Sequence, residues 1–333
     1  MENNLGRSVV IKGIGAYKPK RVLTNDDLAK IVDTSDEWIF TRTGIKERLI
    51  AGESETPSFM GLEASKVALE RAGLEASVID LLVVATLSPD MPFPSTSCLI
   101  QNKLGLKPIA CFDVQAACSG FLFALEIASK MMLSGNYKNA LVVGTEKMSG
   151  ILDWKDRSTC VLFGDGAGAA VLTKVNEANV GIIDGILCAD GSQAELLCQP
   201  GGGSACPASI ESIKEGKHFL KMNGREIFKN AVRLMEQVSL NILEKNKLSA
   251  KDIDLVIPHQ ANIRIINALS TRLNIPIEKF FLNLSRFGNT SAASIPLALN
   301  DAYEQGLLKK GANILLVAFG GGLTWASTLL KWS

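Results

Sequence analysis

Three residues of chemically useful types lie beside apolar segments of the chain: Cys118, His259 and Asn289. Cys118 comes just before the apolar stretch 121–133, so we expect it at the N-terminal end of a buried helix. Free N–H groups and the helix dipole at such an end favour a thiolate, which predicts a lowered pKa and a nucleophilic role. A buried, inert thiol is the common alternative, and position alone leaves both open.

His259 and Asn289 occupy the kinds of loop in which catalytic groups collect. His259 follows the apolar run 255–257 after a proline, and ligand-binding groups gather at the carboxyl ends of buried strands. Asn289 lies in the segment 286–294, which leads into a helix-like stretch; a simple Asn-capped turn is the alternative. Gly320, Gly321 and Gly322 follow another apolar run, and glycines let a backbone N–H approach a ligand closely.

The elements that must position these residues alternate between strand and helix. Short apolar runs at 81–84, 141–143, 169–172, 255–257 and 314–317 predict strands buried on both faces, and helices are expected at 57–73, 118–134, 224–245, 261–273 and 292–306. Three segments of the first half resemble segments 174 residues further on, for example 79–83 and 253–257. We therefore predict a duplicated α/β fold with halves 1–175 and 176–333, two unrelated α/β domains being the alternative.

Composition excludes several classes of function. The 333 residues carry 35 basic and 34 acidic side chains, so the net charge of +1 gives no case for a nucleic-acid or membrane partner. No run approaches roughly 18 uninterrupted apolar residues, so no membrane span is expected. Seven cysteines without CxxC spacing predict reduced thiols in a cytoplasmic protein, and two histidines exclude a metal site that needs three.

The motifs together resemble a known family. DVQAACSG around Cys118, PHQAN around His259, GNTSAAS around Asn289 and the FGGG loop are similar to those of thiolase-superfamily condensing enzymes, above all the β-ketoacyl-[acyl-carrier-protein] synthase III family. The segments TSDEWIFTRTGI, FPSTSC, DRSTCVLFGDGAGAA and KMNGREIFK extend the resemblance over the whole chain. It implies a thiolase-like fold: duplicated α/β halves with mixed sheets covered and separated by helices.

The resemblance implies an acyltransferase that performs the initiating condensation of type II fatty acid synthesis. Cys118 would take the acyl group of an acyl-CoA, such as acetyl-CoA, with the N–H groups of Cys118 and Gly321 as oxyanion hole. Malonyl-acyl carrier protein would then lose carbon dioxide, and its enolate would attack the acyl-cysteine to give a 3-ketoacyl product. His259 and Asn289 would donate hydrogen bonds to the enolate oxygen. Neither a cofactor nor a metal is implied.

Substrate-binding roles follow from the same resemblance. Five residues are implied in CoA binding, with Trp38 and Arg157 sandwiching the adenine: Thr34, Trp38, Arg42, Arg157 and Asn262. Phe93 would line the acyl pocket from the partner subunit of a homodimer. Core packing for the aromatic residues and solvation for the arginines are the alternatives.

A basic stripe predicts the surface that docks the carrier protein. Arg225, Lys229 and Arg233 follow helical spacing, and Arg264 and Arg272 are likewise eight residues apart. Because acyl carrier proteins are acidic, such a face would steer their approach, with Arg264 as the best single candidate. A merely solvated charged face is the alternative.

Other functions stay open on these patterns. A specialised type III-like acyltransferase or a condensing enzyme of secondary metabolism would share the Cys-His-Asn set. A thiol hydrolase would share the nucleophile but release a free acid. A catalytically silent acyl-CoA-binding protein would be expected to lack one of Cys118, His259 and Asn289, and all are present. Primer length and branching are not predicted.

Overall fold

Two mixed β-sheets form the framework of the computed structural model, which describes residues 6–333. The first sheet has the order β1-β7-β6-β4-β5. Its strands are β1 (Ser8–Tyr17), β4 (Leu81–Ala85), β5 (Ala110–Val114), β6 (Asn139–Lys147) and β7 (Asp165–Val175). The second sheet, in the order β11-β12-β13-β8, contains β8 (Gly181–Ala189), β11 (Leu255–Pro258), β12 (Asn313–Gly320) and β13 (Thr324–Lys331). All five predicted strands are confirmed.

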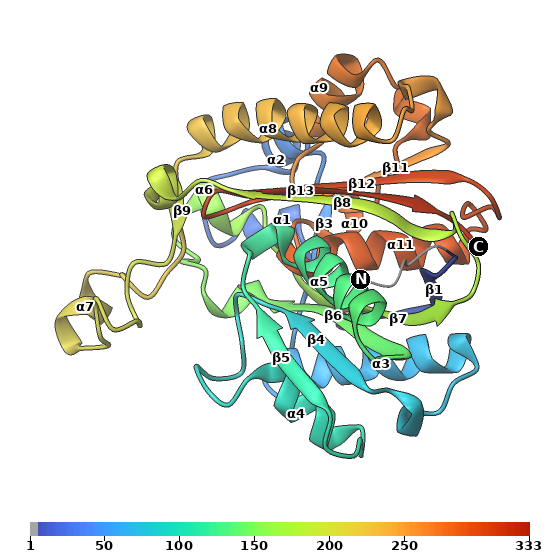
Figure 1. Ribbon diagram of the computed structural model, residues 1–333. Coiled ribbons are helices and arrows are strands. Elements are labelled where there is room, and N and C mark those ends of the chain that lie inside the picture. Colours follow the sequence, from blue (N-terminus) through green and yellow to red (C-terminus); the bar gives the residue numbers. More distant parts are fainter. Residues whose placement is uncertain (1–5) are drawn as a thin grey trace.

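Helices separate the two sheets and cover their outer faces, as Figure 1 shows. Between the sheets lie α5 (Gly120–Ser134) and α11 (Ser294–Glu304), whose apolar side chains share one core with the inner faces of both sheets. The outer face of the first sheet packs against α3 (Pro57–Ala72) and α4 (Thr96–Lys103). The outer face of the second packs against α8 (Gly224–Lys245) and α9 (Ile263–Leu273). The expected α/β class with covered and separated mixed sheets is confirmed.

The 174-residue offset in the sequence corresponds to matching elements in the structure. The pairs β4 and β11, α5 and α11, and β6 and β12 start at or within one residue of this spacing. A short 3-10 turn precedes each central helix, at Ala117–Ser119 and at Ser291–Ala293. Ala117 and Ser291 open these turns with φ angles of 45° and 47°, a left-handed conformation that side chains rarely adopt. The two junctions are therefore built alike.

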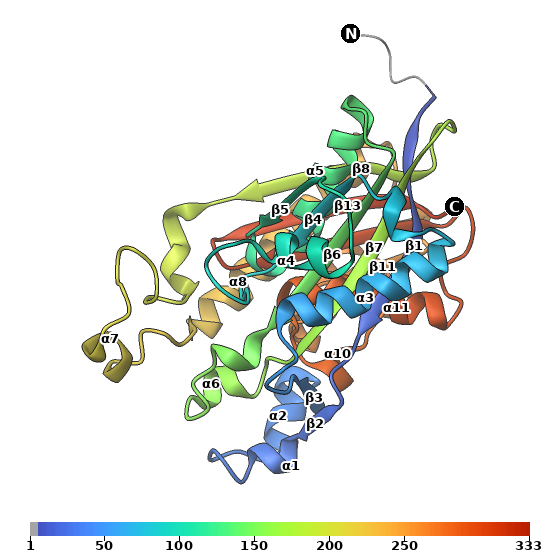
Figure 2. The same ribbon diagram turned by 90° about the horizontal axis from the view of Figure 1, so that it is seen from below.

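Short helices and strands cover one side of the molecule, and a separate segment projects away from it. The two-stranded antiparallel sheet of β2 (Arg21–Thr24) and β3 (Glu47–Ile50) lies with α1 (Asn25–Leu28), α2 (Asp36–Thr43), α6 (Arg157–Cys160) and α10 (Leu284–Phe287). The segment between β8 and α8 contains β9 (Leu197–Cys198), α7 (Ile210–Lys214) and β10 (Lys221–Met222). In Figure 2, α7 projects away from the rest of the molecule. Ser35 and Asn262 cap α2 and α9, which fixes where these two helices begin.

Among the residues that the structure describes, one segment has the length and hydropathy of a membrane span, namely Ala117–Ser134. It coincides with the turn before α5 and with α5 itself, and 61% of it is buried inside the protein. Its apolar surface is occupied by the two sheets, which is what the core helix of a globular protein requires.

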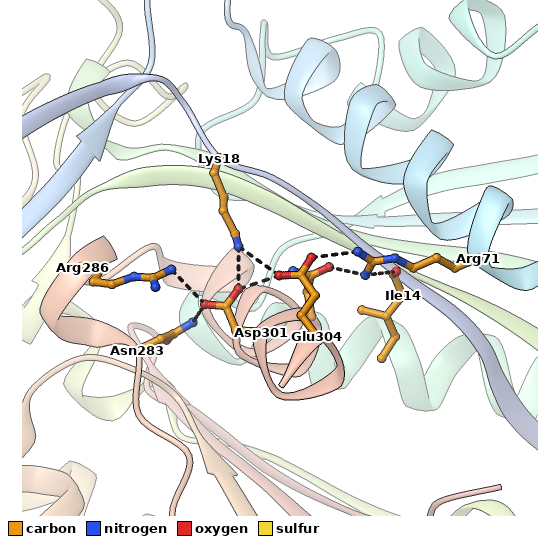
Figure 3. Close-up of polar contacts among 8 residues, drawn as sticks. Ile14, Lys18, Arg71, Asn283, Arg286, Asp301 and Glu304 are labelled. Atoms are coloured by element: carbon orange, nitrogen blue, oxygen red, sulfur yellow. Dashed lines mark hydrogen bonds and ion pairs between the residues drawn. The ribbon is translucent and has the colours of Figure 1, made fainter. Parts of the chain in front are cut away.

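A polar cluster joins elements from both halves of the chain (Figure 3). Asp301 of α11 accepts from Lys18 at 2.6 Å and lies 3.5 Å from Arg286, while Arg71 of α3 pairs with Glu304 at 2.8 Å. Asp301 is buried, and it also accepts from Asn283 at 3.2 Å. The carboxylates near the C-terminal end of α11 thus tie that helix to the first half of the chain.

Candidate active site

Cys118, His259 and Asn289 meet at one cavity of about 220 Å³. They come from three separate loops: the turn before α5, the end of β11 and the segment after α10. All three are buried, with 6%, 5% and 6% of their surfaces exposed. Apolar side chains such as Phe228 and Met235 of α8 line the rest, so the polar groups act in a water-poor space.

Cys118 lies where the sequence predicts, in the turn that leads into α5. The Gly320 backbone packs directly against it: a Cβ at Gly320 would lie 2.6 Å from the Cys118 nitrogen, so only glycine fits there. The expected lowering of the thiol pKa is wrong. Burial raises the pKa of Cys118 to about 12, and a smaller favourable interaction with Ser291 does not offset it.

His259 is held by its backbone and by one side chain. Its N–H donates to the Val317 carbonyl of β12 at 2.8 Å, which continues the parallel pairing of β11 and β12. Its ring Nδ1 lies 2.6 Å from the Ser294 hydroxyl, at the first residue of α11. Burial lowers the pKa of His259 to about 4, so the ring is neutral at physiological pH.

Asn289 presents its amide in a defined orientation. Its N–H donates to the Leu162 carbonyl at 2.8 Å, and its own carbonyl accepts from Gly164 at 3.0 Å. The side-chain Oδ1 accepts from the Ser291 N–H at 2.8 Å. Because the oxygen is engaged in this way, the Asn289 NH2 group is the part left to donate into the cavity.

A second, wider cavity of about 680 Å³ reaches Cys118 from another side. Gly321 lines this cavity together with Met91, Met148 and Leu220, whereas Gly320 lines the smaller one. The expected oxyanion donor Gly321 therefore shares a cavity with Cys118, while its neighbour makes the closer backbone approach.

A third cavity, of about 440 Å³, brings cationic side chains together at the surface. It is lined by Trp38, Arg42, Arg157, Arg225, Lys229, Asn262 and Arg264 among others. It shares Leu162, Gly224, Phe228 and Asn262 with the Cys118 cavity, so the two spaces adjoin. Several residues predicted for CoA binding and several predicted for carrier docking thus line the same surface cavity, which we call the cationic mouth.

The predicted CoA residues lie together at α2, α6 and the start of α9. The Arg42 and Arg157 guanidiniums lie 4.5 Å and 4.6 Å from the centre of a Trp38 ring. A sandwiched adenine therefore requires Arg157 to move off Trp38. Asn262 caps α9 and donates to the Arg42 carbonyl at 3.1 Å. The buried Thr34 hydroxyl has no hydrogen-bond partner among residues 6–333.

The predicted docking residues differ in whether their charges are paired with acidic side chains. Lys229 pairs with Glu226 at 2.9 Å and Arg272 with Glu236 at 2.6 Å, which reduces their net field. Arg233 donates to Asn230 at 3.0 Å. Arg225 and Arg264 line the cationic mouth itself, and Arg264 lies 5.6 Å from the centre of the Phe228 ring.

Phe93 does not line the three cavities described above, although Met91 and Pro92 beside it line the second, and 84% of its surface is exposed. It belongs to the loop between β4 and α4, beside β5, which is an edge strand of the first sheet. An aromatic side chain so exposed is unusual in a lone subunit.

Sequence reasoning missed two buried polar residues beside the site. Ser294 contacts His259, and Glu146 at the end of β6 accepts from the Ser88 hydroxyl at 2.6 Å and from the Leu87 and Ser88 N–H groups. Burial raises the pKa of Glu146 to about 7. The run LVVGTEK carried a signal for Glu146, because a lone acid at the end of a buried strand needs partners.

The cysteines are free thiols, with the Cys98 and Cys111 sulfurs 3.7 Å apart. All seven cysteines are free, as predicted. Within the part of the chain that the structure describes, no three His, Cys, Asp or Glu side chains are grouped as metal ligands.

Comparisons with known proteins agree with the geometry. The family 3-oxoacyl-[acyl-carrier-protein (ACP)] synthase III matches residues 112–191, and its C-terminal family matches residues 243–332. The β-ketoacyl-[acyl-carrier-protein] synthase III of Caldanaerobacter subterraneus subsp. tengcongensis is 52% identical over 97% of both chains. The crystal structure of the synthase III from Aquifex aeolicus VF5 has a TM-score of 0.90 at 52% identity, covering 97% of this chain and all of that one. A priming β-ketosynthase of the R1128 polyketide pathway has a TM-score of 0.89 at 36% identity, over 98% of this chain and 96% of that one.

The fold and the site define a thiolase-fold condensing enzyme, an acyltransferase of fatty acid biosynthesis. The chain belongs to the β-ketoacyl-[acyl-carrier-protein] synthase III family, whose members catalyse the initiating condensation of fatty acid synthesis, and it performs this reaction. Acyl-CoA and malonyl-acyl carrier protein are the substrates that membership of this family implies.

Proposed function

We propose that Cys118, His259 and Asn289 carry the two half-reactions. In the first, the Cys118 sulfur attacks the acyl-CoA carbonyl, the C–S bond to CoA breaks, and an acyl-cysteine forms. The proton lost by Cys118 is balanced by the proton gained by the departing CoA thiol. The N–H groups of Cys118 and Gly321 are the proposed oxyanion donors, supported by the cavity that the two residues share.

In the second half-reaction the malonyl C–C bond breaks and carbon dioxide leaves. Its electron pair forms an enolate, which attacks the acyl-cysteine carbonyl and returns Cys118 as the leaving group. The observation that carries the proposal is the convergence of a thiol, a neutral imidazole and an amide NH2 on one buried cavity. Neutral donors stabilise a developing oxyanion there without a charged group that burial would destabilise.

Both substrates enter through the cationic mouth in this proposal. Their pantetheine arms pass Asn262 and Phe228 toward Cys118, since the adjoining cavities share these residues. Thr34, Trp38, Arg42 and Arg157 bind the CoA nucleotide. Arg225, Lys229 and Arg264 at the mouth contact the acidic carrier protein, with Arg233 and Arg272 further along the same helices.

We further propose a cytoplasmic homodimer in which Phe93 enters the partner's acyl pocket. The exposed Phe93 ring and the open edge of β5 support this arrangement. Free thiols in all seven cysteines suit a reducing compartment. The division into halves 1–175 and 176–333 remains part of the proposal, supported by the adjacent strands β7 and β8 lying in different sheets.

The test separates the two half-reactions in His259→Ala and Asn289→Ala. Acylation of Cys118 by acetyl-CoA should survive in both variants, while condensation with malonyl-acyl carrier protein should fall about 100-fold or more. His218→Ala is the matched control, since it removes the other histidine. Equal loss of acylation and condensation in the site variants would contradict the assigned roles.

A further inference from the structure

We propose that Ser294 is a positioning residue that holds neutral His259 in the tautomer with its proton on Nε2. The inference rests on the proposed role of His259 as a donor to the enolate oxygen. The Ser294 hydroxyl lies 2.6 Å from His259 Nδ1, and both side chains are buried. His259 lines the Cys118 cavity, so the nitrogen on the other side of the ring is the one available to substrate.

The hydrogen-bonding requirements of the two buried groups decide whether Ser294 or His259 Nδ1 is the donor. Among residues 6–333, the ring nitrogen is the one hydrogen-bond partner recorded for the Ser294 hydroxyl. If Nδ1 carried the proton and donated to Ser294, the buried hydroxyl hydrogen would be left without an acceptor, at a cost of about 1–3 kcal/mol. If Ser294 donates to Nδ1, both groups are satisfied. Nδ1 is then the acceptor, and a neutral ring must carry its proton on Nε2.

Neighbouring groups favour the neutral ring that this argument needs. Burial lowers the His259 pKa, and within the described residues no carboxylate hydrogen-bonds the ring to offset that effect. Ser294 is the first residue of α11, where the positive end of the helix dipole also disfavours an imidazolium.

The internal duplication shows that the fold does not need this hydroxyl. The residues 174 positions before His259 and Ser294 are Ala85 and Gly120, at the end of β4 and the start of α5. These two also lie side by side, because a Cβ at Gly120 would lie 3.1 Å from the Ala85 Cβ. The same junction is therefore built from Ala and Gly in one half and from His and Ser in the half that carries the donor.

The tautomer determines which of the two half-reactions uses His259. With Nε2 protonated, His259 donates to the enolate oxygen beside the Asn289 NH2 group. The same nitrogen has no lone pair to accept the Cys118 proton, so His259 does not act as the base in acylation. Ser294 should therefore matter in the second half-reaction and not in the first.

Kinetics of the two half-reactions test this directly. Ser294→Ala should acylate Cys118 at the wild-type rate but condense about 10- to 100-fold more slowly, by analogy with the partners that orient metal-bound histidines. Ser294→Thr keeps a hydroxyl and should recover most of the loss. Ser129→Ala is the matched control, because it removes a buried α5 hydroxyl that has no hydrogen-bond partner in the described chain. It should condense normally.

NMR of the imidazole nitrogens in the wild-type enzyme tests the tautomer without any variant at Ser294. The chain has two histidines, so ¹⁵N-histidine labelling with His218→Gln assigns His259. The expected result is a protonated Nε2 and an unprotonated Nδ1 at neutral pH. A protonated Nδ1, unchanged condensation in Ser294→Ala, or equal losses in both half-reactions would overturn the inference. Failure of wild-type acylation would instead refute the proposed function.

Discussion

At the scale of single residues, Cys118 shows two opposing effects on one thiol. The helix end beside it favours the thiolate, which is what the sequence predicts. Removing the sulfur from water favours the thiol, and burial prevails, with the pKa raised to about 12. Neighbours in sequence reveal the helix end, whereas the depth of burial depends on segments as distant as Phe319 and Asn289.

The raised pKa predicts how Cys118 reacts with an alkylating agent. Only the thiolate reacts, so the rate should rise about tenfold per pH unit between about pH 6 and pH 9, without a plateau. Peptide mass spectrometry after iodoacetamide treatment follows Cys118 separately from the exposed Cys98. A plateau below about pH 8 would show that the helix end, and not burial, sets the pKa.

Residue types also explain what sequence could predict of the site. Cys118, His259 and Asn289 lie in distinctive motifs, so each could be predicted from its neighbours alone, and the structure brings all three to one cavity. Ser294 and Glu146 were missed because their roles come from contacts with residues 35 and 58 positions away. Nothing local separates Ser294 from a surface serine, and the acid at the end of the apolar run LVVGTEK indicates burial of Glu146 but not its partners.

At the scale of elements, α8 and α9 place the basic stripe beside the entrance. Sequence spacing alone puts Arg225, Lys229 and Arg233 on one side of α8. The structure adds that carboxylates on α8 pair with Lys229 and Arg272, while Arg225 and Arg264 line the mouth. Such pairings depend on how two helices pack, which helical periodicity does not predict.

Charge reversal at α9 tests the docking role of this surface. Arg264→Glu should raise KM for malonyl-acyl carrier protein about tenfold at low salt and weaken its salt dependence, because steering depends on complementary charge. Steady-state condensation assays over a range of salt concentrations measure both quantities. Lys138→Glu makes the same charge change at an exposed site before β6 and should leave KM unchanged. An equal effect of both variants would indicate only a net-charge response.

At the scale of the whole molecule, two similar halves contribute different chemistry to one cavity. The first half provides Cys118, the proposed nucleophile, and the second provides His259 and Asn289, the proposed donors. The sequence predicted this division because the buried strands and central helices repeat at one offset. It did not predict β1 or β8, whose patterns include glycines and mixed burial, nor the polar cluster around Asp301.

The polar cluster should stabilise the contact between the two halves. Asp301→Asn removes a buried charge from Lys18, Arg286 and Asn283, so the free energy of unfolding should fall by about 2 kcal/mol. Urea denaturation followed by circular dichroism measures the change. The control Glu63→Gln disrupts the exposed pair with Lys66 and should cost less than about 1 kcal/mol. Equal stability of the two variants would refute a special role for Asp301.

The central claim is that Cys118 carries the acyl group between two half-reactions. The most direct test is the intact mass of the protein after mixing with acetyl-CoA, beside Cys118→Ala. The wild type should gain one acetyl group, which malonyl-acyl carrier protein then removes as a 3-ketoacyl product, and the variant should gain none. Folded wild-type protein that stays unmodified with acetyl, branched and longer acyl-CoA primers, or acetylation that persists in Cys118→Ala, would contradict the account.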